Sequence, residues 1–245
     1  IGSVGKADPT YAPSGLYVLG TDLTDDGDYE NNLTDHEYQA VTPSISTRYY
    51  IDTKIFFNRW INVQNTDTAY IDLSVDNGST WTNIWLNEKS YTEGKWNFQE
   101  YNIKNLGERI NELKVRFALG STDDAFSMSG WNIDYFFVTW NFLNKDVGIT
   151  SWNWPISACG HTDEEYVEVT IQNYAGLVLN DPLVLSYSLD GGATVKYDTI
   201  QNPNLAVDAS MTYTIDKPAD LTTPGWYNNV YATTNLAGDE DSRNN

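Results

Sequence analysis

The 245-residue chain has few of the side chains that build reactive or thiolate metal centres. Cys159 is its single cysteine, and His36 and His161 are its two histidines. One cysteine excludes both an internal disulfide and a cluster of metal-binding thiolates. Neither histidine lies in an HExxH motif, and the sequence has no GxSxG nucleophile elbow or phosphate-binding glycine loop. Because acidic residues are too common for any one pair to indicate glycoside hydrolysis, we expect no enzymatic activity.

Basic residues are also scarce, with 14 Lys and Arg against 34 Asp and Glu and a formal net charge of −20. Such a surface repels nucleic acid and anionic lipid, so we expect no nucleic-acid partner. No apolar run approaches the roughly 18 residues of a membrane helix, so we expect no membrane insertion. The charge suits an extracellular or cell-surface protein. The chain starts at Ile1 without a signal peptide, and we interpret it as a piece of a longer protein.

Aromatic residues are abundant, at 14% of the chain, and they favour β-sheets, where large rings pack well on a pleated face. Short stretches of alternating apolar and polar residues recur, and Gly, Asn, Asp or Pro separates them. Examples are YIDLSV (70–75), KVRFAL (114–119), EYVEVTIQNY (165–174) and LVLSYSLDGG (183–192). The turns SVDNGSTW (74–81) and SLDGGATV (188–195) predict hairpins. We therefore expect an all-β protein with two sandwiches and a boundary near residue 144.

One acidic stretch, GTDLTDDGDYENN (20–32), raises the question of a cation site. An EF-hand aligned on Gly27 would place Leu33 at the twelfth position, where a bidentate carboxylate is needed. The EF-hand interpretation therefore fails. A sandwich-type calcium site remains open, because its six to eight oxygen ligands come from distant strands. The alternative is a solvated acidic turn.

The first part of the chain resembles the MAM-like jelly-roll domains of secreted bacterial proteins, which also occur beside immune-inhibitor-type peptidases. The matching segments follow the order of that family. They are LGTDLTDDGDYENN (19–32), VTPSI (41–45), IFFNRW (55–60), AYIDLSVDNGSTWTNI (69–84), KWNFQEYNI (95–103), VRFALGS (115–121) and GWNIDYFFV (130–138). The resemblance implies a jelly-roll β-sandwich over residues 1–144.

The second part, residues 145–245, resembles CARDB-like immunoglobulin-type domains of secreted Bacteroidetes proteins. The segments that carry this resemblance are DVGITS (146–151), CGHTDEEYVEVTIQNYA (159–175), LSYSLDGGATVKY (185–197) and AGDEDSRNN (237–245). The resemblance implies an immunoglobulin-like β-sandwich that follows the jelly roll.

The jelly-roll resemblance also implies a structural Ca²⁺ near the first strand. Its ligands would include Asp22, and Asp134 of the closing motif is a second candidate. Asp28 and Glu30 are further candidates. In WNIDYF (131–136), Trp131, Ile133 and Tyr135 alternate away from Asn132 and Asp134, so Asp134 points opposite the core face of Trp131 and Ile133 or lies at a bulge.

Several tryptophans are candidates for sugar binding, because flat rings stack on sugar faces. Trp81, Trp96 and Trp131 occupy core positions of the resembled family, so we expect them to be structural. Trp85, Trp152 and Trp154 are the ligand-binding candidates. The alternation of the strand that begins at 147 would turn Trp152 and Trp154 toward solvent, a sugar or the neighbouring domain.

These features predict non-catalytic modules of a large secreted or cell-surface bacterial protein, working in adhesion or display with a calcium-stabilised jelly roll. Expected partners are host or environmental glycans, cell-surface proteins and neighbouring modules of the same longer chain. One alternative is the carbohydrate-binding accessory region of a secreted hydrolase or peptidase. A second alternative is a filament-forming structural subunit.

Overall fold

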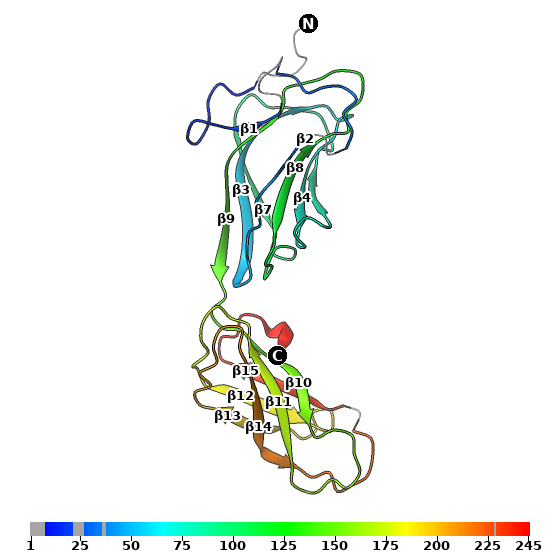
Figure 1. Ribbon diagram of the computed structural model, residues 1–245, viewed down its shortest axis with the longest axis vertical. Helices are drawn as coiled ribbons and strands as arrows, with labels where there is room; N and C mark the ends of the chain where they lie inside the picture. Colours follow the sequence, from blue (N-terminus) through cyan, green and yellow to red (C-terminus); the bar gives the residue numbers. More distant parts are fainter. Residues whose placement is uncertain (1–7, 22–26, 36–37, 228) are drawn as a thin grey trace. The chain divides into compact units, whose positions relative to one another are not determined.

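The computed structural model describes residues 8–21, 27–35, 38–227 and 229–245 (Figure 1). The regular structure of these residues is β-strand, apart from one 3₁₀ turn, η1 (Ser242–Asn244). The expected all-β fold is confirmed. The chain forms two compact units, residues 1–141 and 142–245, where the sequence placed a boundary near 144. None of the helical structure in the described residues is long and apolar enough to span a membrane.

Unit 1 is a β-sandwich of two antiparallel sheets. The first sheet has the order β1-β9-β3-β6, with β7 also paired to β3. These strands are β1 (Leu19–Gly20), β9 (Gly130–Phe142), β3 (Tyr50–Val63), β6 (Tyr91–Thr92) and β7 (Asn97–Asn102). The second sheet has the order β2-β8-β4-β5. Its strands are β2 (Tyr38–Val41), β8 (Lys114–Leu119), β4 (Ala69–Ser74) and β5 (Thr82–Leu86).

The core of unit 1 follows the alternation read from the sequence. On β3, Ile55, Phe57 and Ile61 are fully buried, while Phe56 between them is only partly covered. The faces of β4 and β8 that the sequence predicted as apolar also belong to this core. Burial of one face of each strand is what holds the two sheets together.

A bulge in β9 changes which side chains reach the core. Trp131 and Ile133 are buried as expected, but Tyr135 is 53% exposed and adopts a left-handed φ of 55°. After this residue Phe136 packs against the core, so the alternation has shifted by one position. The alternation of Tyr135 with Trp131 and Ile133 therefore ends at a bulge, which is one of the two alternatives that the sequence left open for this stretch. An inserted residue of this kind bends a strand and re-aims its side chains.

Unit 2 consists of two three-stranded antiparallel sheets. One has the order β10-β11-β14, formed by β10 (Val147–Trp154), β11 (Glu165–Asn173) and β14 (Ser210–Ala219). The other has the order β13-β12-β15, formed by β13 (Lys196–Ile200), β12 (Leu183–Ser188) and β15 (Tyr231–Leu236). Its core includes Val167, Val169 and Ile171, all fully buried, as the alternation in the sequence predicted.

The predicted hairpin between β4 and β5 is present and closes through side-chain hydrogen bonds. Ser74 Oγ donates to Asp76 Oδ1 (2.8 Å) and accepts from the backbone N–H of Gly78 (2.7 Å). Asp76 Oδ1 also accepts from the backbone N–H of Thr80 (2.8 Å). Asn77 and Gly78 have positive φ angles of 60° and 95°, which is the backbone geometry that such a turn requires.

The hairpin between β12 and β13 repeats this turn in unit 2. Ser188 Oγ donates to Asp190 Oδ1 (2.8 Å) and accepts from the N–H of Gly192 (2.8 Å). Asp190 Oδ1 accepts from the N–H of Thr194 (2.8 Å). The second predicted hairpin is therefore also present. Asp76 and Asp190 are structural counterparts, one in each unit.

The C-terminal segment packs on the first strand of unit 2. Asn244 Nδ2 donates to Asp146 Oδ1 (2.7 Å), and the N–H of Glu240 donates to the carbonyl of Lys145 (2.9 Å). Gly148 faces the same segment so closely that a Cβ there would lie 2.3 Å from the carbonyl oxygen of Asn244. The acidic and amide-rich end of the sequence is thus part of the unit 2 fold.

Candidate functional site

The predicted calcium ligands lie at several places in unit 1, and Asp22 is outside the described residues, as is His36. Asp134 accepts hydrogen bonds from the backbone N–H groups of Ser14 (2.7 Å) and Tyr135 (2.6 Å). Glu30 is exposed and accepts a hydrogen bond from the Tyr38 hydroxyl. Asp28 is half-buried. Within the described ranges, no group of three or more His, Cys, Asp or Glu side chains is placed to hold a metal ion.

Two residues that sequence reasoning missed lie on the Asp134 side of β9. Asn132 is fully buried, and its Nδ2 donates to Asp8 Oδ1 (2.6 Å). Its Oδ1 is also buried and has no hydrogen-bond partner. A buried amide oxygen without a donor costs free energy, and a carboxylate and an amide oxygen are ligands that Ca²⁺ prefers. The chemistry of Asn132 and Asp8 therefore fits a calcium ion. The signal in the sequence was the position of Asn132, two residues before Asp134 on the same strand face.

Trp85 of β5 packs within unit 1. Its ring stacks on Trp131 with centroids 5.7 Å apart and meets Tyr91 edge-on at 5.9 Å. The Arg59 guanidinium lies 5.2 Å from the centre of the same ring. These contacts use the ring faces for packing, so the geometry gives Trp85 a structural role.

Trp152 and Trp154 of β10 differ from one another. Trp152 packs against the unit 2 core, and its Nε1 donates to the carbonyl of Pro155 (2.9 Å). Trp154 is 40% exposed, and its Nε1 donates to Glu165 Oε2 (3.2 Å). Of the three predicted ligand-binding tryptophans, Trp154 thus presents the most open ring.

A groove of about 590 Å³ lies at one end of unit 2. It is bordered by the β12–β13 turn, the start of β13, the end of β14 and the loop between β14 and β15. Its lining residues are Tyr187, Leu189, Asp190, Thr194, Lys196, Ala219, Asp220, Trp226, Tyr227 and Asn229. The volume is within the range of about 300–1,000 Å³ that is usual for small-ligand sites.

The aromatic side of this groove comes from the β14–β15 loop. Trp226 is 90% exposed, which is rare for so large an apolar ring. Tyr227, next to it, is also exposed, and its hydroxyl donates to the carbonyl of Thr223 (3.0 Å). The N–H of Gly191 in the β12–β13 turn donates to the carbonyl of Asn229 (3.1 Å). This backbone bond joins the loop to the turn, so both sides of the groove are held together.

The polar side of the groove carries two ionised carboxylates. The N–H of Thr194 holds the pKa of Asp190 below its usual value, and Ser188 adds to the effect. The Thr222 hydroxyl and N–H lower the pKa of Asp220 in the same way. A glycosidase needs one carboxyl group with a raised pKa as its general acid, and neither of these has one. Near neutral pH the two carboxylates are therefore hydrogen-bond acceptors for the donor groups of a ligand.

Trp226 is not among the ligand-binding candidates that the sequence predicted. The segment PGWY (224–227) gave the signal, because Pro and Gly indicate a loop and two adjacent aromatics in a loop have no strand face to pack on. Asp190 belongs to a hairpin-turn motif, and the turn alone accounts for an aspartate at this position. The sequence therefore supplies no reason to assign it a binding role.

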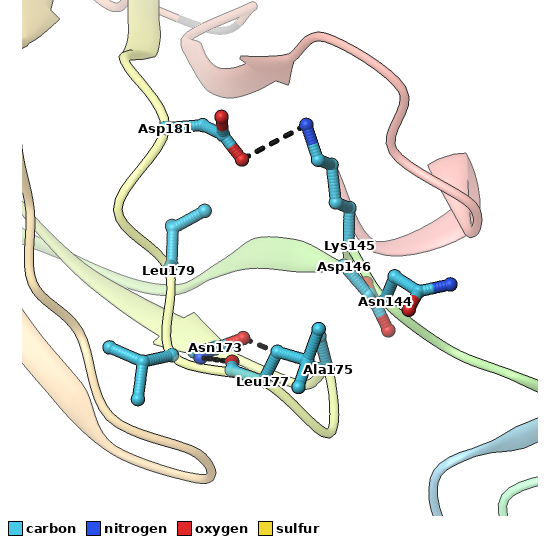
Figure 2. Close-up of a pocket in the computed structure, with 9 residues that line it drawn as sticks. Asn144, Lys145, Asp146, Asn173, Ala175, Leu177, Leu179 and Asp181 are labelled. Carbon is cyan, nitrogen blue, oxygen red and sulfur yellow. Dashed lines mark hydrogen bonds and ion pairs between the residues drawn. The ribbon is translucent and has the colours of Figure 1, made fainter.

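A smaller hollow lies elsewhere in unit 2, with a volume of about 90 Å³ (Figure 2). Lys145 Nζ and Asp181 Oδ2 form an ion pair across it (2.9 Å), and Asn173 Nδ2 donates to the Leu177 carbonyl (2.8 Å). Its volume is below the usual ligand range, so the Trp226 groove is the stronger site.

Comparisons with known proteins assign the chain to no family. No protein-family model matches, and no curated protein matches. One similar solved structure is the glycoside hydrolase domain of Spr0440, Endo-D, from Streptococcus pneumoniae R6, at 10% identity and a TM-score of 0.25. The match covers 80% of this chain and 32% of that one, so the chain spans about a third of its length.

Another is the N-terminal CBM22-1–CBM22-2 tandem domain of Xyn10C from Paenibacillus barcinonensis, at 12% identity and a TM-score of 0.24. This match covers 93% of this chain and 90% of that one. At these TM-scores neither likeness carries a functional argument, and the MAM-like and CARDB-like resemblances stay predictions.

Proposed function

We propose that this chain is a non-catalytic carbohydrate-binding region of a secreted or cell-surface protein, and that the Trp226 groove of unit 2 is its binding site. The observation that carries the proposal is the almost fully exposed Trp226 ring at the edge of a groove with ionised carboxylates. Contact between an exposed indole ring and water costs free energy, and a ligand that covers the ring removes that cost. The apolar face of a pyranose ring would cover it.

The groove offers both kinds of contact that a sugar requires. Trp226 and Tyr227 supply flat faces, while Asp190 and Asp220 accept hydrogen bonds from hydroxyl groups. Ligand sites commonly combine aromatic walls with a few fixed polar groups in this way. Glycan binding of this type serves adhesion to a surface as well as the targeting of a neighbouring enzyme domain.

The test is binding to a glycan panel by isothermal titration calorimetry, with Trp226→Ala as the variant. We expect about tenfold weaker binding or more, because loss of one stacked ring costs roughly 1.4 kcal/mol. Trp154→Ala is the matched control, since it removes another exposed tryptophan of unit 2 outside the groove. Binding that depends on Trp154 and not on Trp226 would move the site to β10 and contradict the assignment.

We also propose that Ca²⁺ stabilises unit 1, with Asn132 and Asp8 among its ligands. The buried Asn132 Oδ1 without a donor supports this proposal. A bound cation would satisfy that oxygen and tie residues near the start of the chain to β9.

Calcium binding predicts a higher melting temperature with 1 mM CaCl₂ than with EDTA, measured by calorimetry, because a ligand that binds only the folded state stabilises it. In Asn132→Ala this calcium response should be lost even where the variant is less stable in both buffers. Equal melting temperatures of the wild-type protein in calcium and in EDTA would contradict the proposal.

A further inference from the structure

The carboxylates of the Trp226 groove are fixed in place by their own turns. Asp190 Oδ1 accepts from Ser188 Oγ and from the N–H of Thr194 (both 2.8 Å). Asp220 Oδ1 accepts from the Thr222 hydroxyl (2.6 Å) and N–H (3.0 Å). The Thr194 side chain adds a further hydrogen bond to the Asp190 carboxylate. An ionised carboxylate has about four acceptor positions, so each retains capacity for a ligand's donors.

Lys196 is the basic residue among the described residues of the groove lining. Its Nζ donates to the carbonyl of Pro218, near the end of β14. The ammonium group keeps its positive charge and adds to the Thr222 hydrogen bonds in lowering the pKa of Asp220. Two carboxylates against one ammonium group leave the described lining with a net negative charge, in a chain with a net charge of −20.

We propose that the groove selects glycans that carry no negative charge, and that Asp190 and Asp220 determine this selectivity. This inference rests on the proposed function, and it names the class of sugar that the site takes. Hydroxyl groups of a neutral sugar, or the ammonium group of an amino sugar, donate to the two carboxylates. A uronate or sulfate group would instead bring a third negative charge into a groove whose described lining has two carboxylates and one ammonium group, and like charges at close range repel.

The selectivity leads to a defined ranking of glycans. Neutral β-glucan and xylan oligosaccharides should bind through Trp226, with an affinity that is nearly independent of salt. Chitosan oligosaccharides should bind as well or more tightly, and added salt should remove that advantage, because salt screens exposed charges. Polygalacturonate and sulfated oligosaccharides should bind at least tenfold more weakly than neutral oligosaccharides of the same length.

The experiment measures Kd for these three classes by titration calorimetry at 50 and 500 mM NaCl, with the full chain and the variants Asp220→Asn and Asp190→Asn. Both substitutions should raise the affinity for the anionic oligosaccharides by about fivefold or more. Asp76→Asn is the matched control, because Asp76 occupies the equivalent turn of unit 1 and accepts the same two bonds at Oδ1, with a further bond from the Thr80 hydroxyl to Oδ2 (2.6 Å). Asp76→Asn should destabilise its own turn to a similar extent without changing the Kd for any of the three glycan classes.

The outcomes separate the inference from the proposed function. Trp226-dependent binding of anionic glycans with the same or higher affinity than neutral ones would overturn the inference and leave the function standing. An unchanged charge preference in both groove variants would also overturn it. If no glycan of any class bound in a manner that depends on Trp226, the proposed function would fail, and the inference with it.

Discussion

At the scale of single residues, one buried ion pair in unit 1 is closely matched. Arg116 and Asp72 pair through Nη2 at 2.5 Å and Nε at 3.2 Å, and both side chains are almost fully buried. The Arg116 guanidinium also lies 4.3 Å from the centre of the Trp81 ring. Trp81 was expected to be structural from its place in the sequence, and its stacking on Arg116 supplies the physical reason. The pairing partner could not be predicted, because β4 and β8 are far apart in the chain.

Arg116→Leu should lower the free energy of unfolding of unit 1 by about 3–5 kcal/mol, because it leaves Asp72 charged and buried without its partner. Urea denaturation checks this prediction. Lys54→Met is the control, since it breaks the exposed Lys54–Glu100 pair and should cost less than about 1 kcal/mol. Equal effects of the two substitutions would show that burial of the Arg116–Asp72 pair has no energetic consequence.

At the scale of elements, local sequence signals identified the two hairpins, whereas they left the bulge in β9 as one of two alternatives. Both turn motifs contain their own determinants: a serine, an aspartate and residues with positive φ within a few positions. The bulge at Tyr135 has no such local signal, since WNIDYF continues to alternate in the sequence. Its position depends on contacts from distant segments, such as the hydrogen bond from Ser14 to Asp134. Long-range contacts of this kind are what sequence reasoning lacks.

The β4–β5 turn should become pH-sensitive in acid. Hydrogen bonds from the hydroxyl and N–H of Thr80 lower the pKa of Asp76 from 3.8 to about 2. Because the folded-state value is depressed, the contribution to stability is complete above about pH 4 and is lost as the pH falls toward 2. The difference in melting temperature between wild type and Asp76→Asn should therefore shrink between pH 5 and pH 2. A constant difference over that range would contradict an ionised Asp76 as the determinant of the turn.

At the scale of the whole molecule, each unit has a hydrophobic core of its own. The sequence predicted this division from the repeated sandwich patterns, since each set of strands needs a core to cover its apolar faces. The groove was harder to predict. It brings together the β12–β13 turn and the β14–β15 loop, which are separated in the sequence by β13 and β14 and meet only in the folded unit. The binding role that we propose for Trp226 depends on the Asp190 and Asp220 carboxylates of the same groove.

Independent cores predict that damage to one unit leaves the other folded. Removal of residues 239–245 should destabilise unit 2 by about 3 kcal/mol or more, because several hydrogen bonds to charged groups are lost at once. The unfolding transition of unit 1 should keep its midpoint in the truncated protein. Scanning calorimetry separates the transitions of the two units, and the transition that shifts in Arg116→Leu is that of unit 1. A single transition that moves as a whole with either change would contradict independent unfolding.

The most direct test of the proposed function is the affinity of the full chain for neutral oligosaccharides with and without the Trp226 ring. We expect the wild-type protein to bind a neutral β-linked oligosaccharide by titration calorimetry, and we expect Trp226→Ala to weaken that binding about tenfold or more while its melting temperature stays unchanged. An affinity that is the same in wild type and Trp226→Ala, with Trp154→Ala as the control, would contradict the groove as the binding site of this protein.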